Sequence, residues 1–207
     1  KLDLDAPVEQ YVPEFKDIKV HSKRKNVPTN KKPTVRDLMR HTAGLTYGFF
    51  SNTAVDKMYK KDHPLFVSSS SAMIEKLAQY PLLHQPGEKW HYSMATDVLG
   101  YVVEQASSMS LGTFMKQRIF DPLEMRDTDF YVQNSNLERF ASSYGPNLKL
   151  VEDRSKSPFA DSERFQSGGG GLVSTAEDYM KFAQLLLNGG ELNGVRLLTS
   201  SSVEEMT

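Results

Sequence analysis

The sequence contains no cysteine. Without a thiol, the chain forms no disulfide, offers no thiolate nucleophile and holds no cysteine-ligated zinc site. Its five histidines include no His-x-x-x-His pair, the spacing that places two imidazoles on one face of a zinc-binding helix. His84 and His91 lie on either side of a Pro-Gly turn, and we expect both to be surface or packing residues. The sequence therefore implies neither a metal ion nor any other cofactor.

Long apolar runs are missing as well. Runs such as Leu185–Leu187 are far shorter than the roughly 20 residues of a membrane-spanning helix, so we expect no membrane span. The 25 basic and 26 acidic residues nearly cancel, and a net charge of −1 gives no global attraction to nucleic acid. No signal peptide is visible, so we expect a cytoplasmic protein, with a periplasmic or secreted one as the close alternative. Nothing in the sequence indicates the oligomeric state.

The hydrophobic content of 39% is sufficient for a packed core, and a length of 207 residues favours a single domain. Helical spacing of apolar residues, together with capping residues, predicts a mostly helical chain. Thr34 with Asp37 and Ser174 with Glu177 have the spacing of capping boxes. The expected helices run from about Thr34 to Gly44, Ser71 to Tyr80, Ser93 to Ala106, Ser110 to Asp121, Ser174 to Gly189, and onward from Ser201.

Between Thr128 and Leu150 the pattern changes to short apolar segments separated by turn residues, which predicts short strands. These are expected at Phe130–Val132, Ala141–Tyr144 and Leu148–Val151. Residues 16–33, which are basic and contain prolines, are expected to form an exposed excursion. The predicted fold class is α+β, mainly a helical subdomain with short antiparallel strands.

Several catalytic motifs are absent, among them the Gly-x-Ser-x-Gly elbow of α/β-hydrolases, the P-loop and the Gly-x-Gly-x-x-Gly dinucleotide fingerprint. One Ser-x-x-Lys match occurs, from Ser22 to Lys25. That pair needs a buried helix so that the lysine can take the serine proton. The segment around it is basic and breaks at Pro28, so we interpret the match as a coincidence. The glycines at 168–171 are expected to form a flexible approach to a helix.

Tyr92 lies where the Pro86-Gly87 turn meets the start of the most apolar helix. The positive field of a helix N-terminus favours a phenolate, which would suit proton transfer. By itself, however, a tyrosine in such a place is more often a packing residue whose hydroxyl is satisfied.

Several segments of the chain resemble the serine β-lactamase-like hydrolases, a family that includes class C β-lactamases, DD-peptidases and related carboxylesterases. Leu2–Val8 and Tyr11–Phe15 are similar to the segment after the nucleophile helix of that family. Pro86–Ser93 resembles its Pro-Gly-Thr-x-Trp-x-Tyr-Ser motif. Further blocks follow in the family's order and span essentially the whole chain: Thr34–Leu45, Asp97–Glu104, Phe120–Thr128 and Gly169–Tyr179.

The resemblance implies the β-lactamase/DD-peptidase fold, an antiparallel sheet flanked by helices, and hydrolysis through a serine acyl-enzyme. It makes Tyr92 the catalytic tyrosine of the family's Tyr-x-Asn element, acting as general base and acid. The Ser-x-x-Lys helix is expected before Lys1, and the third element, Lys-Thr-Gly or an equivalent, after Thr207. On this interpretation residues 1–207 are one β-lactamase-related domain that is incomplete at both ends, and the isolated chain is expected to be inactive.

Tyr92 is followed by Ser93 and Met94 where the family has x-Asn. Methionine cannot donate the hydrogen bond that the asparagine gives to a substrate amide, whereas an ester needs no such donor. We therefore expect a small-molecule substrate, a short-chain carboxylic ester rather than a lactam, with Ser93 and Met94 in the substrate site. The alternative is that Met94 simply packs in the core.

By resemblance, Tyr47 and Gly170 also border the substrate cleft, and Tyr47 with Phe49 and Phe50 could line an acyl pocket. His41 is expected to pair with carbonyl groups at the end of its helix instead of contacting substrate. The alternatives to an esterase are a β-lactamase or D-Ala-D-Ala carboxypeptidase and, from another class, a catalytically inactive relative that binds peptides or acts as a scaffold.

Overall fold

The computed structural model describes residues 2–207, which form two compact units. The first unit comprises residues up to Leu111 together with Phe165–Gly170, and the second comprises Gly112–Arg164 and Gly171–Thr207. Both are helix-rich and carry short antiparallel strand pairs, so the predicted α+β class is confirmed.

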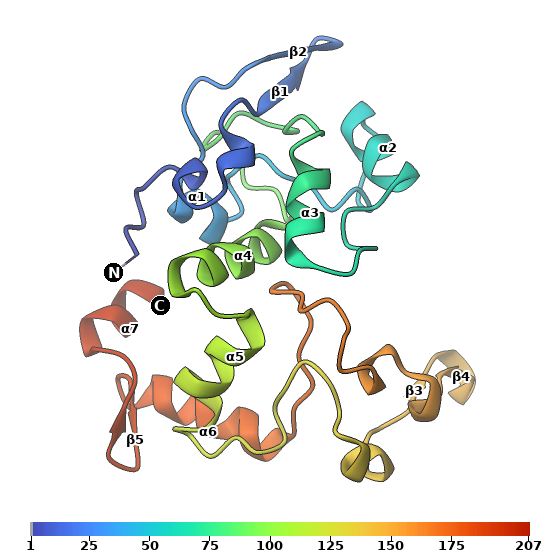
Figure 1. The fold of residues 1–207 in the computed structure, drawn as a ribbon, viewed down its shortest axis with the longest axis vertical. Helices are drawn as coiled ribbons and strands as arrows, with labels where there is room; N and C mark the ends of the chain where they lie inside the picture. The colour runs from blue at the N-terminus through green and yellow to red at the C-terminus, as the bar shows by residue number, and fades with distance from the viewer. Residues whose placement is uncertain (1) are drawn as a thin grey trace. The chain divides into compact units, whose positions relative to one another are not determined.

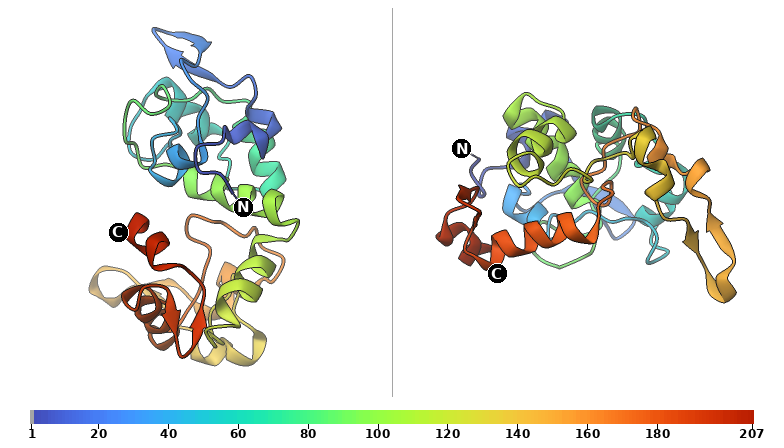
Figure 2. Two further views of the ribbon diagram at one scale, coloured as in Figure 1. Left: turned by 90° about the vertical axis from the view of Figure 1, so that its left-hand side faces the viewer. Right: turned by 90° about the horizontal axis from the view of Figure 1, so that it is seen from below.

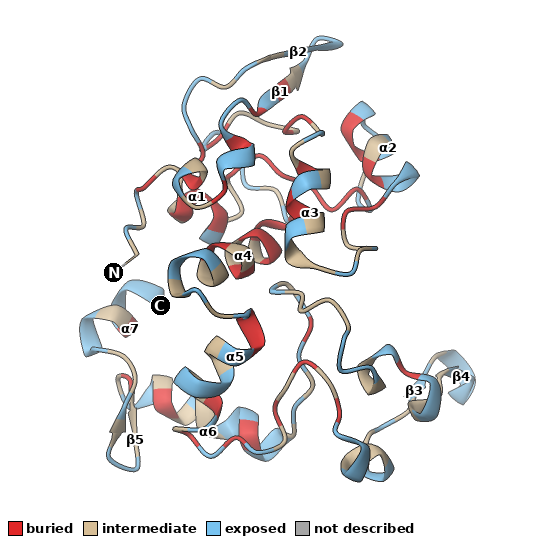
Figure 3. Ribbon diagram, in the orientation of Figure 1, coloured by how far each residue is buried: buried red, intermediate tan, exposed pale blue. Residues whose placement is uncertain are grey.

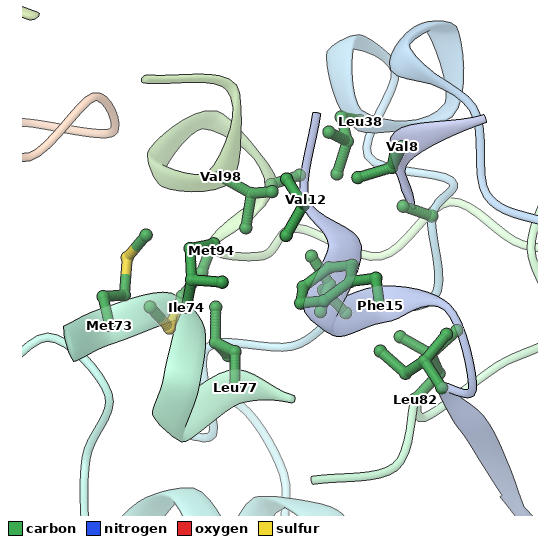
Figure 4. Close-up of a cluster of buried hydrophobic side chains, with 14 of the residues drawn as sticks. Val8, Val12, Phe15, Leu38, Met73, Ile74, Leu77, Leu82, Met94 and Val98 are labelled. Atoms are coloured by element: carbon green, nitrogen blue, oxygen red, sulfur yellow. The ribbon is translucent and has the colours of Figure 1, made fainter. Parts of the chain in front are cut away.

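The first unit is built around helix α4 (Ala95–Ser107), which packs against α1 (Val35–Met39) and α3 (Ser70–Leu77). Most residues in the first two turns of α4 are buried (Figure 3). Its core also takes in the N-terminal segment, where two short 3-10 turns (Val8–Gln10 and Pro13–Phe15) hold apolar side chains inward. The labelled core residues in Figure 4 are Val8, Val12, Phe15, Leu38, Met73, Ile74, Leu77, Leu82, Met94 and Val98.

The basic segment expected as an exposed excursion is mostly exposed and forms a β-hairpin of β1 (Lys19–Ser22) and β2 (Lys25–Pro28). It extends from the helices of the first unit in Figures 1 and 2. Lys23 and Arg24 form its two-residue turn, both with positive φ. Val20 anchors the hairpin because its side chain is buried in the core. Because charged residues dominate this segment, the sequence pattern did not reveal that Val20 attaches it to the core.

Helix α2 (Ala54–Lys61) was not expected from the sequence. It begins with a complete capping box, in which Thr53 and Asp56 bond each other's backbone amides. The capping box predicted for Thr34 and Asp37 is confirmed at the start of α1. That helix ends at Met39, before the expected Gly44, because His41 already adopts positive φ.

Helix α5 (Leu111–Met115) begins at the last residue of the first unit's long segment and continues into a π-helical turn (Lys116–Phe120) of the second unit. The second unit also contains α6 (Ala176–Leu187) and α7 (Ser200–Met206). Phe120, Leu123, Met125 and Leu185 form its core. The N-cap of α6 is Thr175, which accepts from the Asp178 amide, and not the expected Ser174.

Two hairpins complete the second unit: β3 (Ser143–Tyr144) with β4 (Leu150–Glu152), and β5 (Glu191–Leu192) with β6 (Val195–Arg196). The strand expected at Phe130–Val132 does not form. Only the neighbouring Asp129 makes a bridge, to Val173. Within residues 2–207, no helix is both long enough and apolar enough to cross a bilayer.

Candidate active site

Tyr92 lies in the irregular segment that leads into α4, three residues before the helix begins. Its side chain is 44% exposed, whereas the two residues after it are almost completely buried. The backbone thus turns inward directly after Tyr92 and leaves the phenol at the surface of the first unit. Such a phenol is accessible to a substrate and to solvent protons.

Other aromatic rings surround Tyr92. The ring centroids of His41 and Tyr47 lie 4.9 and 5.2 Å from that of Tyr92, and those of Phe50 and Trp90 lie 6.0 and 6.5 Å away. Phe50 and Trp90 are exposed, at 65% and 63%. Tyr92 therefore lies beside two exposed aromatic side chains, an apolar surface of the kind that ligands frequently occupy.

Tyr47 differs from Tyr92 in its environment. It is buried, and its hydroxyl donates a hydrogen bond to Oδ2 of Asp97 over 3.4 Å. Burial, and then the negative charge of Asp97, raise the pKa of Tyr47 well above its ordinary value. Tyr47 is thus held as a neutral hydrogen-bond donor. Its ring stacks on Phe49, which in turn stacks on the buried His63.

His41 was expected to pair with carbonyl groups at the end of its helix, but its ring has a different partner. Its Nδ1 lies 3.3 Å from Oγ of Ser93, and its main-chain carbonyl accepts from the His91 amide. Burial lowers the pKa of His41, so the neutral ring is favoured beside Tyr92.

Met94 and Ser93 lie in the interior of the first unit, and their expected role as substrate contacts stays a prediction. Met94 is completely buried and packs in the core cluster beside Ile74 and Leu77 (Figure 4). Ser93 is equally buried and faces His41. It does not cap α4 either, because the N-cap position is Met94. The burial of Met94 agrees with the alternative in which it packs in the core.

The glycine-rich segment is docked on α4 and is not a free approach to a helix. A Cβ added to Gly168 would lie 2.4 Å from the Thr96 carbonyl oxygen and 3.3 Å from the Gly100 Cα, so the two backbones touch directly. Gly170, expected at the cleft edge, is exposed, and a Cβ there would meet nothing within 4 Å. The expected place of Gly170 at the edge of a substrate cleft stays a prediction.

Asp97 holds this segment and was missed by the sequence analysis. Its carboxylate is 2% exposed and accepts hydrogen bonds from Ser167 Oγ at 2.5 Å and from the Gly169 amide at 3.1 Å, besides the Tyr47 hydroxyl. No local pattern identifies it, because its three donors belong to residues 47, 167 and 169, which are far from Asp97 in the chain.

Ser22 lies on the exposed β1 strand and pairs with Lys25 across the hairpin. The two residues are therefore not on a helix, which agrees with the interpretation of their spacing as a coincidence. His84 and His91 pack edge to face with ring centroids 5.3 Å apart, and His91 Nε2 lies 3.3 Å from Thr46 Oγ1. Among residues 2–207, no cluster of three or more histidine or acidic side chains could hold a metal ion.

Comparison with known proteins places this chain in a family. The beta-lactamase family model matches residues 1–207, and the chain belongs to that family. Protein Rv1367c of Mycobacterium tuberculosis is 33% identical over all of this chain and 53% of its own length. Esterase EstB of Burkholderia gladioli is 31% identical over 87% of this chain and 50% of its own.

Among solved structures, EstCE1, described as a hydrolase with promiscuous acyltransferase activity, superimposes with a TM-score of 0.77 at 26% identity. The match covers 98% of this chain and 55% of EstCE1. The predicted β-lactamase/DD-peptidase-like fold is confirmed. The chain spans about half the length of the curated relatives it matches.

Proposed function

We propose that the protein carrying this chain is a serine hydrolase that cleaves small carboxylic esters through an acyl-enzyme. One observation carries the proposal: Tyr92 is 44% exposed and lies beside the exposed rings of Phe50 and Trp90. By resemblance, Tyr92 corresponds to the family's catalytic tyrosine. The esterase EstB, similar along most of the chain, supports an ester substrate.

In the proposed reaction, Tyr92 takes the proton from a serine hydroxyl as that oxygen attacks the ester carbonyl. It then returns the proton to the departing alcohol, so that an acyl-serine remains. Water repeats the sequence and releases the acid. The serine belongs, in this proposal, to a segment of the full-length protein outside residues 1–207, because Ser22 on its hairpin does not have the required setting.

The two tyrosines are proposed to have different tasks. Tyr47 stays neutral because burial and the charge of Asp97 raise its pKa, so it can donate a hydrogen bond but cannot act as a base. Tyr92, at the surface, is the residue that exchanges protons. Phe49 and Phe50, both exposed, are proposed to form with Tyr47 the wall that contacts the acyl group.

The burial of Met94 changes one reason for preferring an ester. Its thioether packs in the core and does not line an acyl pocket. Position 94 still offers no amide donor to a lactam or peptide substrate. The preference for an ester over a β-lactam or D-Ala-D-Ala peptide now rests on that missing donor and on the aromatic wall.

The test is Tyr92→Phe in the full-length protein, assayed with p-nitrophenyl butyrate and a chromogenic cephalosporin. The substitution keeps the ring and removes the hydroxyl, so kcat for the ester should fall by about 10²–10⁴, the usual contribution of a general acid–base group. Tyr179→Phe is the matched control, because Tyr179 is an exposed tyrosine of α6.

Three results would contradict the proposal. Unchanged ester kcat in Tyr92→Phe would remove its catalytic role. Faster turnover of the cephalosporin than of the ester by the unmodified protein would favour the lactamase alternative. Absence of any phosphonylated serine after treatment with a fluorophosphonate probe would favour a catalytically inactive relative.

A further inference from the structure

Four helices of the chain have a buried aspartate three positions after the N-cap: Asp37 in α1, Asp56 in α2, Asp97 in α4 and Asp178 in α6. In α1 and α2 this carboxylate completes a capping box with a threonine at the N-cap. In α4 the N-cap is Met94, which makes no side-chain cap. The hydrogen-bond donors of the Asp97 carboxylate belong to other segments of the chain.

Instead, Asp97 joins segments that are far apart in the chain. Its Oδ1 accepts from Ser167 Oγ and the Gly169 amide, about 70 residues along the chain. Its Oδ2 accepts from the Tyr47 hydroxyl, 50 residues away. All three donors are neutral, and the carboxylate is almost completely buried. A buried carboxylate bonded to uncharged donors is costly to desolvate, so its geometry is strongly specified by those bonds.

The glycine at 169 belongs to the same arrangement. A Cβ there would lie 2.7 Å from Oδ2 of Asp97 and 2.8 Å from the Tyr47 hydroxyl oxygen. Only a glycine lets the backbone approach the carboxylate and the phenol together. Asp97 and the backbone at Gly169 therefore both hold the Tyr47 hydroxyl in place. The Tyr47 ring centroid lies 5.2 Å from that of Tyr92.

We infer that Asp97 is a positioning residue of the Tyr92 site: its carboxylate fixes Tyr47 and residues 167–169 against the first turn of α4, and so sets the place of the Tyr92 phenol. The inference rests on the proposed function, because Tyr92 is the group it acts through. Asp97 itself exchanges no proton with substrate. Its effect on the reaction arises from geometry, where displacement of a catalytic group by about 1 Å can cost about a hundredfold in rate.

The test uses the full-length protein and the variants Asp97→Asn, Tyr92→Phe and their combination. An asparagine keeps the shape but has only one acceptor oxygen, so its NH2 group must face at least one of the three donors. We expect kcat for p-nitrophenyl butyrate to fall at least about tenfold in Asp97→Asn. The double variant should be within about threefold of Tyr92→Phe alone, because residues that act as a unit are not additive.

The matched control is Asp178→Asn in the second unit. Asp178 is also buried at the third position of its helix and accepts from the Asp127 amide and Thr128 Oγ1. This variant should lower the melting temperature to a similar extent while its kcat at a temperature below the melt stays unchanged. A role of Asp97 in stability alone would give the same pattern for both aspartates.

A milder variant keeps the inference testable if Asp97→Asn does not fold. Ser167→Ala removes one donor and leaves the carboxylate, and it should lower kcat in the same direction, by about threefold or more. Ser155→Ala is its control, because Ser155 donates to Asp153 in the same manner at the surface of the second unit. Equal kcat in these two serine variants would overturn the inference.

The outcomes separate the two claims. Unchanged kcat in Tyr92→Phe overturns the proposed function, and the positioning role with it. A loss in Tyr92→Phe combined with unchanged kcat in a folded Asp97→Asn variant overturns the positioning role alone. A double variant whose losses multiply shows that Asp97 acts independently of Tyr92, which also overturns it.

Discussion

Replacing Gly168 with alanine should destabilise the protein far more than the same change at Gly170. Both glycines are exposed and lie two residues apart in one loop, so exposure alone predicts equal tolerance. The difference lies in what a new Cβ would meet. At Gly168 it would come within 2.4 Å of the Thr96 carbonyl oxygen, whereas at Gly170 it would meet nothing within 4 Å.

The size of the effect can be worked from that contact. A carbon rarely approaches a carbonyl oxygen more closely than about 3.3 Å, so the loop would have to retreat by about 0.9 Å from α4. The Thr96 oxygen is part of the helix backbone and cannot rotate away. Forcing an extra methyl group into a packed contact costs about 1–3 kcal/mol.

The displaced loop also carries the Gly169 amide, whose bond to Asp97 measures 3.1 Å and would lengthen. Losing a hydrogen bond to a charged group costs about 1.5–3 kcal/mol. Any stabilisation from lower chain entropy in the unfolded state is similar for both alanine variants and cancels in their difference. We therefore expect Gly168→Ala to be less stable than Gly170→Ala by at least about 2 kcal/mol.

Urea unfolding followed by circular dichroism measures this difference directly. Both variants should keep the slope of the transition, with only the midpoint shifted for Gly168→Ala. Equal midpoints would show that residues 167–170 do not pack on α4 in solution. The structural basis for the positioning role of Asp97 would then be lost.

Much of the fold could be predicted because its helices carry local signals. The capping box of Thr34 and Asp37, and the glycines at 189 and 190 after α6, mark helix ends independently of tertiary structure. The α2 helix was missed although Thr53 and Asp56 form an equally good box. Its charged sequence hides the few apolar residues that it buries.

The site was less predictable because it depends on contacts between distant segments. Tyr92 was selected through the family resemblance, and its catalytic role stays a prediction, as does the cytoplasmic location. Burial of Met94 follows from the path of the chain into α4, which no spacing rule reveals. Asp97 gains its meaning only when Tyr47 and residues 167–169 are brought to it by the fold.

Two further predictions concern the surroundings of Tyr92. Burial lowers the pKa of His41, whose ring lies 6.3 Å from that of Trp90, the sole tryptophan. A protonated imidazole quenches indole fluorescence, so tryptophan emission should fall as the pH is lowered, with a midpoint below about pH 6.5, the usual histidine value. His41→Gln should remove that transition. A midpoint above that pH would refute the burial of His41. Met94→Asn should lower the free energy of unfolding by about 1–3 kcal/mol, because its amide would be buried among apolar side chains without a partner. Met39→Asn, at a half-exposed position of α1, is the matched control and should change stability by no more than about 0.5 kcal/mol. If Met94→Asn proved as stable as its control and also accelerated cephalosporin turnover, the side chain at position 94 would face the substrate after all, and the packing assignment would be wrong.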